Sequence, residues 1–201
     1  YHRLFASNRN NFHDLANSEF KEPSKIRTVI SADFDNDGYD EIFFNNIGQP
    51  NRMFRLLNNG TLERVELSAA LESEGLGTGA AVADIDGNGI LDLLIAHGES
   101  APQPLSLFSA NIASAGRFVR IQPINLKDAP ARGATVTLNT NLRSHAKTID
   151  AGSGYLCQME PVAHYGLREN EVINSVSVRW TDGTEKVMTI VEERKTHIVR
   201  Q

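Results

Sequence analysis

Residues 33–41 read DFDNDGYDE, and a stretch of matching layout, DIDGNGILD, follows at residues 84–92, 51 positions later. Both copies place acidic or amide side chains at positions one, three and five, a glycine at position six and a carboxylate at position nine. Each copy lies between short apolar runs, TVISA and IFF around the first and AAVA and LLIA around the second. The chain therefore contains an internal repeat centred on an acidic loop between two strand-like segments.

The repeat extends beyond the loops. Leu4 and Phe5 correspond to Met53 and Phe54, at an offset of 49, and other apolar positions repeat at similar spacing. Short apolar runs rich in Val, Ile and Phe, broken by Asn-Gly and Asp-Gly turn signals, predict roughly four strands in each unit of about fifty residues. The clearest hairpin turn is predicted at Asn59-Gly60. This is the size of a β-propeller blade, in which the acidic loop would join the first two strands. Two such blades cannot close a ring.

The loop pattern predicts a calcium site. Short side-chain oxygens at positions one, three, five and nine, a glycine for the sharp turn at position six and an inward carbonyl at position seven suit a hard cation. Without a cation, the packed carboxylates would repel one another by several kcal/mol. The predicted ligands of the first loop are Asp33, Asp35, Asp37, the Tyr39 carbonyl and Glu41, and those of the second are Asp84, Asp86, Asn88, the Ile90 carbonyl and Asp92.

Two other interpretations of the loops are weaker. A solvated acidic turn explains one copy but not two at matching places between apolar strands, and an EF-hand needs a twelve-residue loop between amphipathic helices. The neutral Asn88 leaves the second site one charge short, so we expect weaker binding there. Glu41 stands where Asp is usual in such repeats, which lengthens that ligand by one methylene.

Charge is unevenly distributed along the chain. The net charge is −5, but residues 28–99 carry thirteen acidic and three basic side chains (−10), whereas residues 117–201 carry nine acidic and twelve basic ones (+3). An acidic block repels phosphate backbones and attracts cations, which disfavours a nucleic-acid partner. No apolar run approaches a membrane span, no signal peptide is visible, and one cysteine cannot form an internal disulfide.

Catalysis has little support in the sequence. The six histidines form no HExxH pair, and Ser153 does not lie in a G-x-S-x-G elbow. We expect His97 and His164 to serve packing or capping, and Cys157 to be buried and inert in an apolar, strand-like stretch. A glycan-cleaving enzyme would need a free pair of carboxylates, and the clustered ones are already assigned to the loops. We therefore predict that the protein is not an enzyme.

The pattern of residues 117–201 predicts a second all-β unit. Alternation of polar and apolar residues at 118–121, 134–138, 176–180 and 187–191 is typical of a sheet buried on one face. An Asp-Gly pair predicts a hairpin turn after Trp180, whose indole we expect in the core.

These segments carry a resemblance to known families. The acidic loops resemble the FG-GAP or VCBS repeat, a calcium-loop propeller blade. The stretches ARGATV at 131–136, DAGSGYLCQMEPVAHYGL at 150–167 and VSVRWTDG at 176–183 resemble the UnbV/ASPIC domain. The combination is similar to the cartilage acidic protein family, whose members are secreted and carry a full propeller ahead of this region. The chain has two blades and lacks the EGF-like module of vertebrate members, so it resembles a bacterial-type relative or a fragment.

The sequence thus predicts an all-β chain: two propeller blades with calcium loops at residues 1–116 and a β-sandwich-like UnbV/ASPIC domain at residues 117–201. We expect an extracellular or cell-surface module that binds a protein or glycan partner, in which calcium is structural. The alternative is a self-assembling subunit that completes its open blade edges with other chains.

Overall fold

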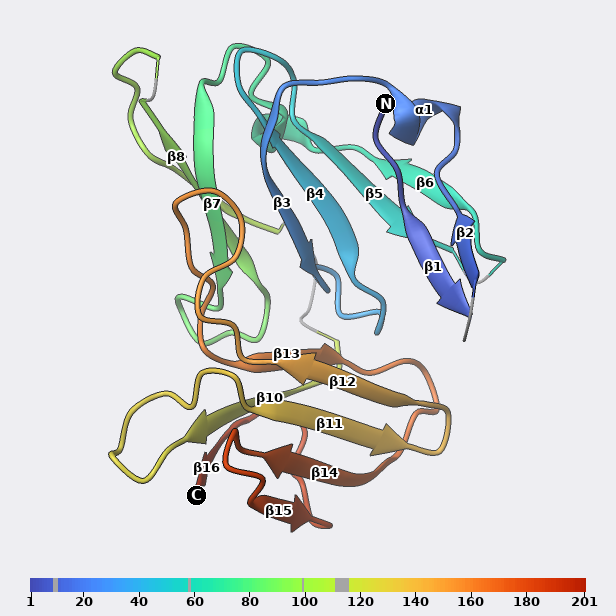
Figure 1. Ribbon diagram of the computed structural model, residues 1–201, viewed down its shortest axis with the longest axis vertical. Coiled ribbons are helices and arrows are strands. Elements are labelled where there is room, and N and C mark those ends of the chain that lie inside the picture. Colours follow the sequence, from blue (N-terminus) through green and yellow to red (C-terminus); the bar gives the residue numbers. More distant parts are fainter. Residues whose placement is uncertain (9–10, 58, 99, 111–115) are drawn as a thin grey trace.

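The computed structural model describes residues 1–8, 11–57, 59–98, 100–110 and 116–201. Within this part of the chain nearly all regular structure is β, as predicted. The first half forms sheets arranged like blades, and the second half forms a separate pair of sheets beneath them (Figure 1). The helical pieces that are described are the single turns α1 (Ser18–Lys21) and η1 (Ser68–Leu71). No described helix has the length and apolar character needed to span a membrane.

The first blade is an antiparallel sheet in chain order, β3 (Ile26–Ala32), β4 (Glu41–Asn46), β5 (Arg52–Leu56) and β6 (Leu62–Val65). Side chains of β3 alternate between buried and more exposed positions, the period of a strand packed on one face. The first acidic loop joins β3 to β4, and the predicted Asn-Gly turn at residues 59–60 joins β5 to β6, so both expectations are confirmed.

The second blade repeats this arrangement with β7 (Gly77–Ala83), β8 (Asp92–His97) and β9 (Ser106–Ser109). The second acidic loop joins β7 to β8, as the first joins β3 to β4. The described residues contain no fourth strand for this blade, and residues 111–115, which follow β9, lie outside them. The predicted domain division between residues 116 and 117 stays a prediction for the same reason.

A hairpin precedes the first blade. Its strands, β1 (Phe5–Asn8) and β2 (Asn11–Asp14), correspond by sequence offset to β5 and β6. The turn α1 follows, and its Phe20 packs edge-on against Phe44 and Phe54 of the first blade, with ring centroids 5.0 Å away in both cases. This apolar cluster holds α1 and the residues that flank the hairpin, Leu4 and Ala16, against one face of the first blade.

The two blades pack face to face through an apolar core. The first blade contributes side chains such as Ile30, Phe43 and Met53, and the second contributes Leu93 and Ile95, all buried. Burying apolar side chains between sheets is the main stabilising contribution to such a stack, worth about 1.5–3 kcal/mol for each large side chain. The blades therefore form a continuous unit with both acidic loops at the same end, facing the second half of the chain (Figure 1).

The C-terminal half is a sandwich of two sheets. One sheet has the order β13 (Ala163–Gly166), β10 (Phe118–Ile124), β16 (Thr196–Arg200), and the other has the order β12 (Ser144–Thr148), β11 (Thr135–Thr140), β14 (Ile173–Arg179), β15 (Glu185–Met188). Trp180 lies in the core between them, as predicted, and its indole N–H donates to the Ile124 carbonyl at 3.1 Å. The hairpin turn joining β14 to β15 is also confirmed.

Residues 151–160, which we call the strap, leave the sandwich and run along β3 and β7 of the blades (Figure 1). The Tyr155 amide donates to the Thr28 hydroxyl at 3.2 Å, and the Glu160 amide donates to the Val82 carbonyl at 3.2 Å. The strap thus connects the sandwich to the innermost described strand of each blade.

The expected strand around Cys157 is wrong. Gly152 and Gly154 adopt positive φ angles of 151° and 72°, which end any extended pairing and turn the chain into a loop. Cys157 is half-buried in the strap, and its thiol donates to the Ser153 carbonyl at 2.7 Å.

Candidate metal centre

The two acidic loops share one hydrogen-bond network. The carboxylate at position one accepts from the glycine amide at position six, at 3.0 Å for Gly38 to Asp33 and 3.0 Å for Gly89 to Asp84. Both glycines have a φ near +85°, at 87° and 83°, which explains why glycine stands at this position in both copies.

Positions three and five make the same turn in each loop. In the first loop, Asp35 Oδ1 accepts from the Asp37 amide at 3.1 Å, and Asp37 Oδ1 accepts from the Tyr39 amide at 2.8 Å. In the second loop, Asp86 Oδ1 accepts from the Asn88 amide at 3.1 Å, and Asn88 Oδ1 accepts from the next-but-one amide at 2.7 Å. Such side chain-to-backbone turns are local, so the sequence pattern alone produces them.

The carboxylate at position nine closes each loop by accepting from the amide at position two. Glu41 Oε2 accepts from the Phe34 amide at 2.9 Å, and Asp92 Oδ2 accepts from the Ile85 amide at 3.0 Å. The longer Glu41 side chain therefore makes the same contact as the aspartate of the other copy.

The first loop keeps unpartnered carboxylate oxygens. Asp33 and Glu41 are only 2% and 3% exposed, and Asp33 Oδ1 and Glu41 Oε1 have no hydrogen-bond partner among the described residues. One carboxylate oxygen from each of Asp33, Asp35 and Asp37 lies within 4.8 Å of the others. An orphaned buried carboxylate oxygen is costly unless a cation satisfies it, so this donor set fits a hard cation.

The electrostatics of the first loop agree with that geometry. Burial raises the pKa of Asp33 to about 7, and the neighbouring Asp40, Asp37 and Asp35 add to the rise, although Lys147 opposes it. Burial also raises the pKa of Glu41 to about 8, with Asp35 as the next contributor. The carboxylates are thus crowded and insufficiently neutralised by the protein itself.

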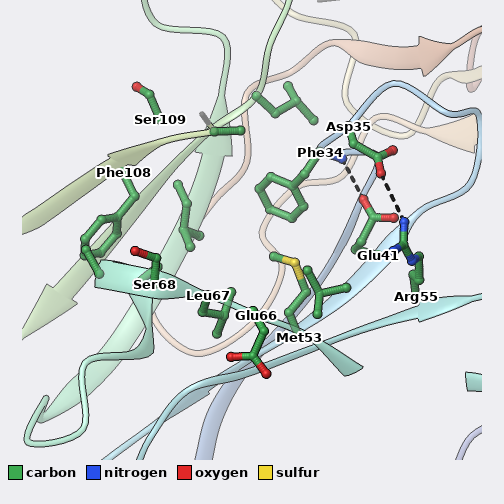
Figure 2. A pocket seen from close by; sticks show the side chains of 16 residues that line it. Phe34, Asp35, Glu41, Met53, Arg55, Glu66, Leu67, Ser68, Phe108 and Ser109 are labelled. Carbon is green, nitrogen blue, oxygen red and sulfur yellow. Dashed lines mark hydrogen bonds and ion pairs between the residues drawn. The ribbon is translucent and has the colours of Figure 1, made fainter. Parts of the chain in front are cut away.

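A cavity of about 480 Å³ opens beside the first loop, between the two blades. Figure 2 shows that Phe34, Met53 and Phe108 form apolar parts of its wall, with Asp35 and Glu41 at one end. Arg55 approaches Asp35 there, with 3.7 Å between Nη1 and Oδ2. Of the predicted ligands of the first loop, Asp35 and Glu41 therefore line this cavity.

The second loop is neutralised differently. Arg120, from β10 of the sandwich, places Nη1 2.9 Å from Asp84 Oδ2. The Ser109 hydroxyl donates to Asp92 Oδ1, and Asn88 Nδ2 donates to Asp86 Oδ2 at 2.9 Å. Asp84 Oδ1 stays buried without a partner among the described residues.

Two basic residues of the sandwich, Arg143 and Lys147, contact the first loop. Arg143 donates through Nη1 to the Gly38 carbonyl and through Nη2 to the Gly166 carbonyl, the latter at 2.8 Å. The Gly166 amide in turn donates to Asp33 Oδ2 at 3.0 Å. Lys147 pairs with Asp40 at 2.8 Å, and these contacts join the sandwich to the loop.

The sequence motifs do not predict these basic contacts. Arg143 and Lys147 lie more than one hundred residues from the first loop in sequence. The one sequence signal for them is the charge difference between residues 28–99, at −10, and residues 117–201, at +3. The Arg168 guanidinium also lies over the Tyr39 ring, 3.6 Å from its centroid, as a cation–π contact.

A buried polar bridge joins both loops to the sandwich. Asn36 donates through Nδ2 to the Gly89 carbonyl of the second loop at 2.8 Å, and its Oδ1 lies 2.6 Å from His164 Nε2. His164 stacks on Phe118, with ring centroids 5.9 Å apart. The packing role expected for His164 is confirmed, and the contact also orients the first loop against the second. His97 likewise contacts the Pro104 carbonyl at 2.7 Å.

The fold and the loops define a chain of FG-GAP-type blades followed by a distinct β-sandwich, and sequence comparison agrees. Residues 33–95 match the family described as FG-GAP-like repeat, and residues 125–201 match the family described as ASPIC and UnbV.

The individual relatives are proteins named cartilage acidic protein 1. The mouse protein is 44% identical across 98% of this chain and 32% of its own length, and the human protein is 49% identical across 86% and 27%. The Xenopus tropicalis protein is 45% identical across 95% and 31%. The resemblance to the cartilage acidic protein family is thereby confirmed over most of this chain. The chain spans about a third of the length of these relatives.

Proposed function

We propose that this chain is a calcium-stabilised propeller segment of an extracellular binding or adhesion protein, in which the first acidic loop is the calcium site. The observation that carries the proposal is the pair of buried, unpartnered oxygens, Asp33 Oδ1 and Glu41 Oε1, beside two further aspartates. The ligands would be Asp33, Asp35, Asp37, the Tyr39 carbonyl and Glu41. The second predicted set, Asp84, Asp86, Asn88, Ile90 and Asp92, stays a prediction of weaker binding.

Calcium would supply positive charge where the protein provides too little. The chain's own residues do the rest: Gly38 and Gly166 amides hold Asp33, and Lys147 holds Asp40. Because the same loop contacts the sandwich, neutralising it supports both the first blade and the contact between the two halves. Sites of this kind in extracellular modules bind calcium at about 10⁻⁴–10⁻³ M.

The binding role is supported by the absence of a catalytic arrangement in the sequence and by the names of the relatives, which describe an acidic protein of cartilage. We infer a protein or glycan partner at an extracellular surface, with no nucleic acid involved.

Thermal unfolding tests the calcium site. Millimolar calcium is expected to raise the melting temperature of the chain relative to excess EDTA, and Asp33→Asn is expected to abolish most of that rise. Asp128→Asn is the matched control, because Asp128 is an exposed carboxylate of the sandwich paired with Arg200. Coincident melting curves with calcium and EDTA would show that the first loop is an acidic turn and would reject the proposal.

A further inference from the structure

The two loops have the same backbone network but a different charge balance. The first carries four predicted carboxylate ligands, and two of their oxygens are buried without partners. The second carries three, because Asn88 replaces the carboxylate at position five. Among the described residues, its position-nine oxygen, Asp92 Oδ1, already accepts from the Ser109 hydroxyl, so one orphan, Asp84 Oδ1, remains.

Arg120 is placed where it neutralises this loop. Its side chain is 5% exposed, and the Asp84 carboxylate that it contacts is 2% exposed. The other end of the guanidinium pairs with Glu160 of the strap, and Nη1 also lies 3.2 Å from the Thr196 hydroxyl. Glu160 Oε2 accepts in addition from the Asp84 amide at 3.2 Å. The guanidinium is therefore held between two carboxylates and cannot leave without exposing buried charge.

We propose that Arg120 is the built-in cation of the second loop, so that this loop stays free of calcium at concentrations that fill the first. Asp84 stands at position one, whose carboxylate is a predicted calcium ligand of this loop pattern. A divalent ion bound there would be repelled by the fixed guanidinium of Arg120. Its ligand at position five would be the neutral amide of Asn88 in place of a carboxylate. It would also compete with the Ser109 hydroxyl for Asp92 Oδ1. The second loop thus keeps the calcium-loop shape while the carboxylate at position one is paired with a cation that the protein itself supplies.

This assignment gives the two loops different roles. Arg120 belongs to β10, so the contact of the sandwich with the second blade is an ion pair that needs no metal. The contact with the first blade passes through a loop that depends on calcium, an assignment that rests on the proposed function. Removing calcium should then loosen one blade contact and leave the other in place.

Calcium stoichiometry of the full chain, measured by equilibrium dialysis with metal analysis, tests the inference. We expect one calcium ion per chain at millimolar calcium, lost in Asp33→Asn and retained in Asp84→Asn. Two ions per chain, or a single ion lost in Asp84→Asn and kept in Asp33→Asn, would overturn the role of Arg120. No bound ion would instead refute the proposed calcium function, so the two failures are distinguishable.

Removing the guanidinium gives the converse test. Arg120→Met, confirmed to be folded by near-ultraviolet circular dichroism, is expected to bind a second calcium ion, and adding Asn88→Asp is expected to tighten that site by about tenfold or more. A stoichiometry of one in both folded variants would show that Arg120 does not exclude the cation. If Arg120→Met does not fold, Asn88→Asp alone decides the question: with Arg120 in place the stoichiometry is expected to stay at one, and a second bound ion would show that the missing carboxylate, not Arg120, keeps this loop free of calcium.

Discussion

At the scale of single residues, His164 shows how burial fixes a protonation state. Asn36 Nδ2 donates to the Gly89 carbonyl, so Asn36 Oδ1 must accept and His164 Nε2 must donate to it. Nδ1 of the same ring is buried without a partner among the described residues. Burial accordingly lowers the pKa of His164 from 6.5 to about 3, with Lys147 and Arg120 adding to the fall, and the ring is neutral in the folded protein.

This neutral histidine predicts a pH dependence. Between about pH 6.5 and pH 3 the unfolded chain binds a proton at His164 that the folded chain does not, so the free energy of unfolding decreases as pH falls, by at most about 1.4 kcal/mol per pH unit. Urea unfolding in calcium at about pH 7 and about pH 5 measures the loss. His164→Gln, which keeps a side-chain donor, should lose less stability between these values than the wild type, whereas His13→Gln, at an exposed position of β2, should behave as the wild type. Equal losses in all three proteins would contradict this explanation.

At the scale of elements, the loops were predictable and their surroundings were not. Every bond inside a loop joins residues at most seven positions apart, so the pattern of Asp, Asn and Gly encodes it directly. Arg120 and Arg143 contact the loops but are distant from them in sequence. The charge difference between the acidic first half and the basic second half was the only sequence feature that pointed to these contacts. The strap was mistaken for a strand because its composition resembles one, although Gly152 and Gly154 prevent pairing.

The close fit between the second loop and β10 predicts different effects for two neighbouring glycines. Gly87 and Gly89 both have positive φ, at 76° and 83°, so alanine strains the backbone equally at either position. A Cβ at Gly89 would lie 2.0 Å from the Phe118 ring, whereas one at Gly87 would meet nothing within 4 Å.

We therefore expect Gly89→Ala to destabilise the protein by about 1–3 kcal/mol more than Gly87→Ala, measured by urea unfolding. Phe118→Leu in the Gly89→Ala background should recover part of the loss, because it makes room for the methyl group. Equal destabilisation by the two alanines would mean that the loop does not pack on Phe118.

At the scale of the whole molecule, the stack of blades ends in an apolar face. Leu94 and Leu107 pair across β8 and β9 and are 37% and 54% exposed. Their counterparts in the first blade, Phe43 and Met53, also pair across strands but are buried against the second blade. The second blade thus presents the kind of face that another sheet would cover.

The 201-residue chain on its own is therefore expected to self-associate. Its average mass in sedimentation equilibrium should increase with protein concentration, and Leu94→Ser with Leu107→Ser should reduce the increase. Leu126→Ser is the control, because Leu126 is an exposed leucine of the sandwich at 78%. A mass that stays monomeric at all concentrations would show that this face does not drive association.

The bridge through Asn36 restricts how such a chain can change by duplication. One asparagine touches the second loop and the sandwich at the same time, and it does so from the first loop. A repeat copied into the chain between the two loops would leave Arg120 beside Asp84 but would move Asn36 away from both Gly89 and His164. We therefore expect the two repeats and the domain after them to be duplicated or deleted together, and new repeats to be inserted ahead of both.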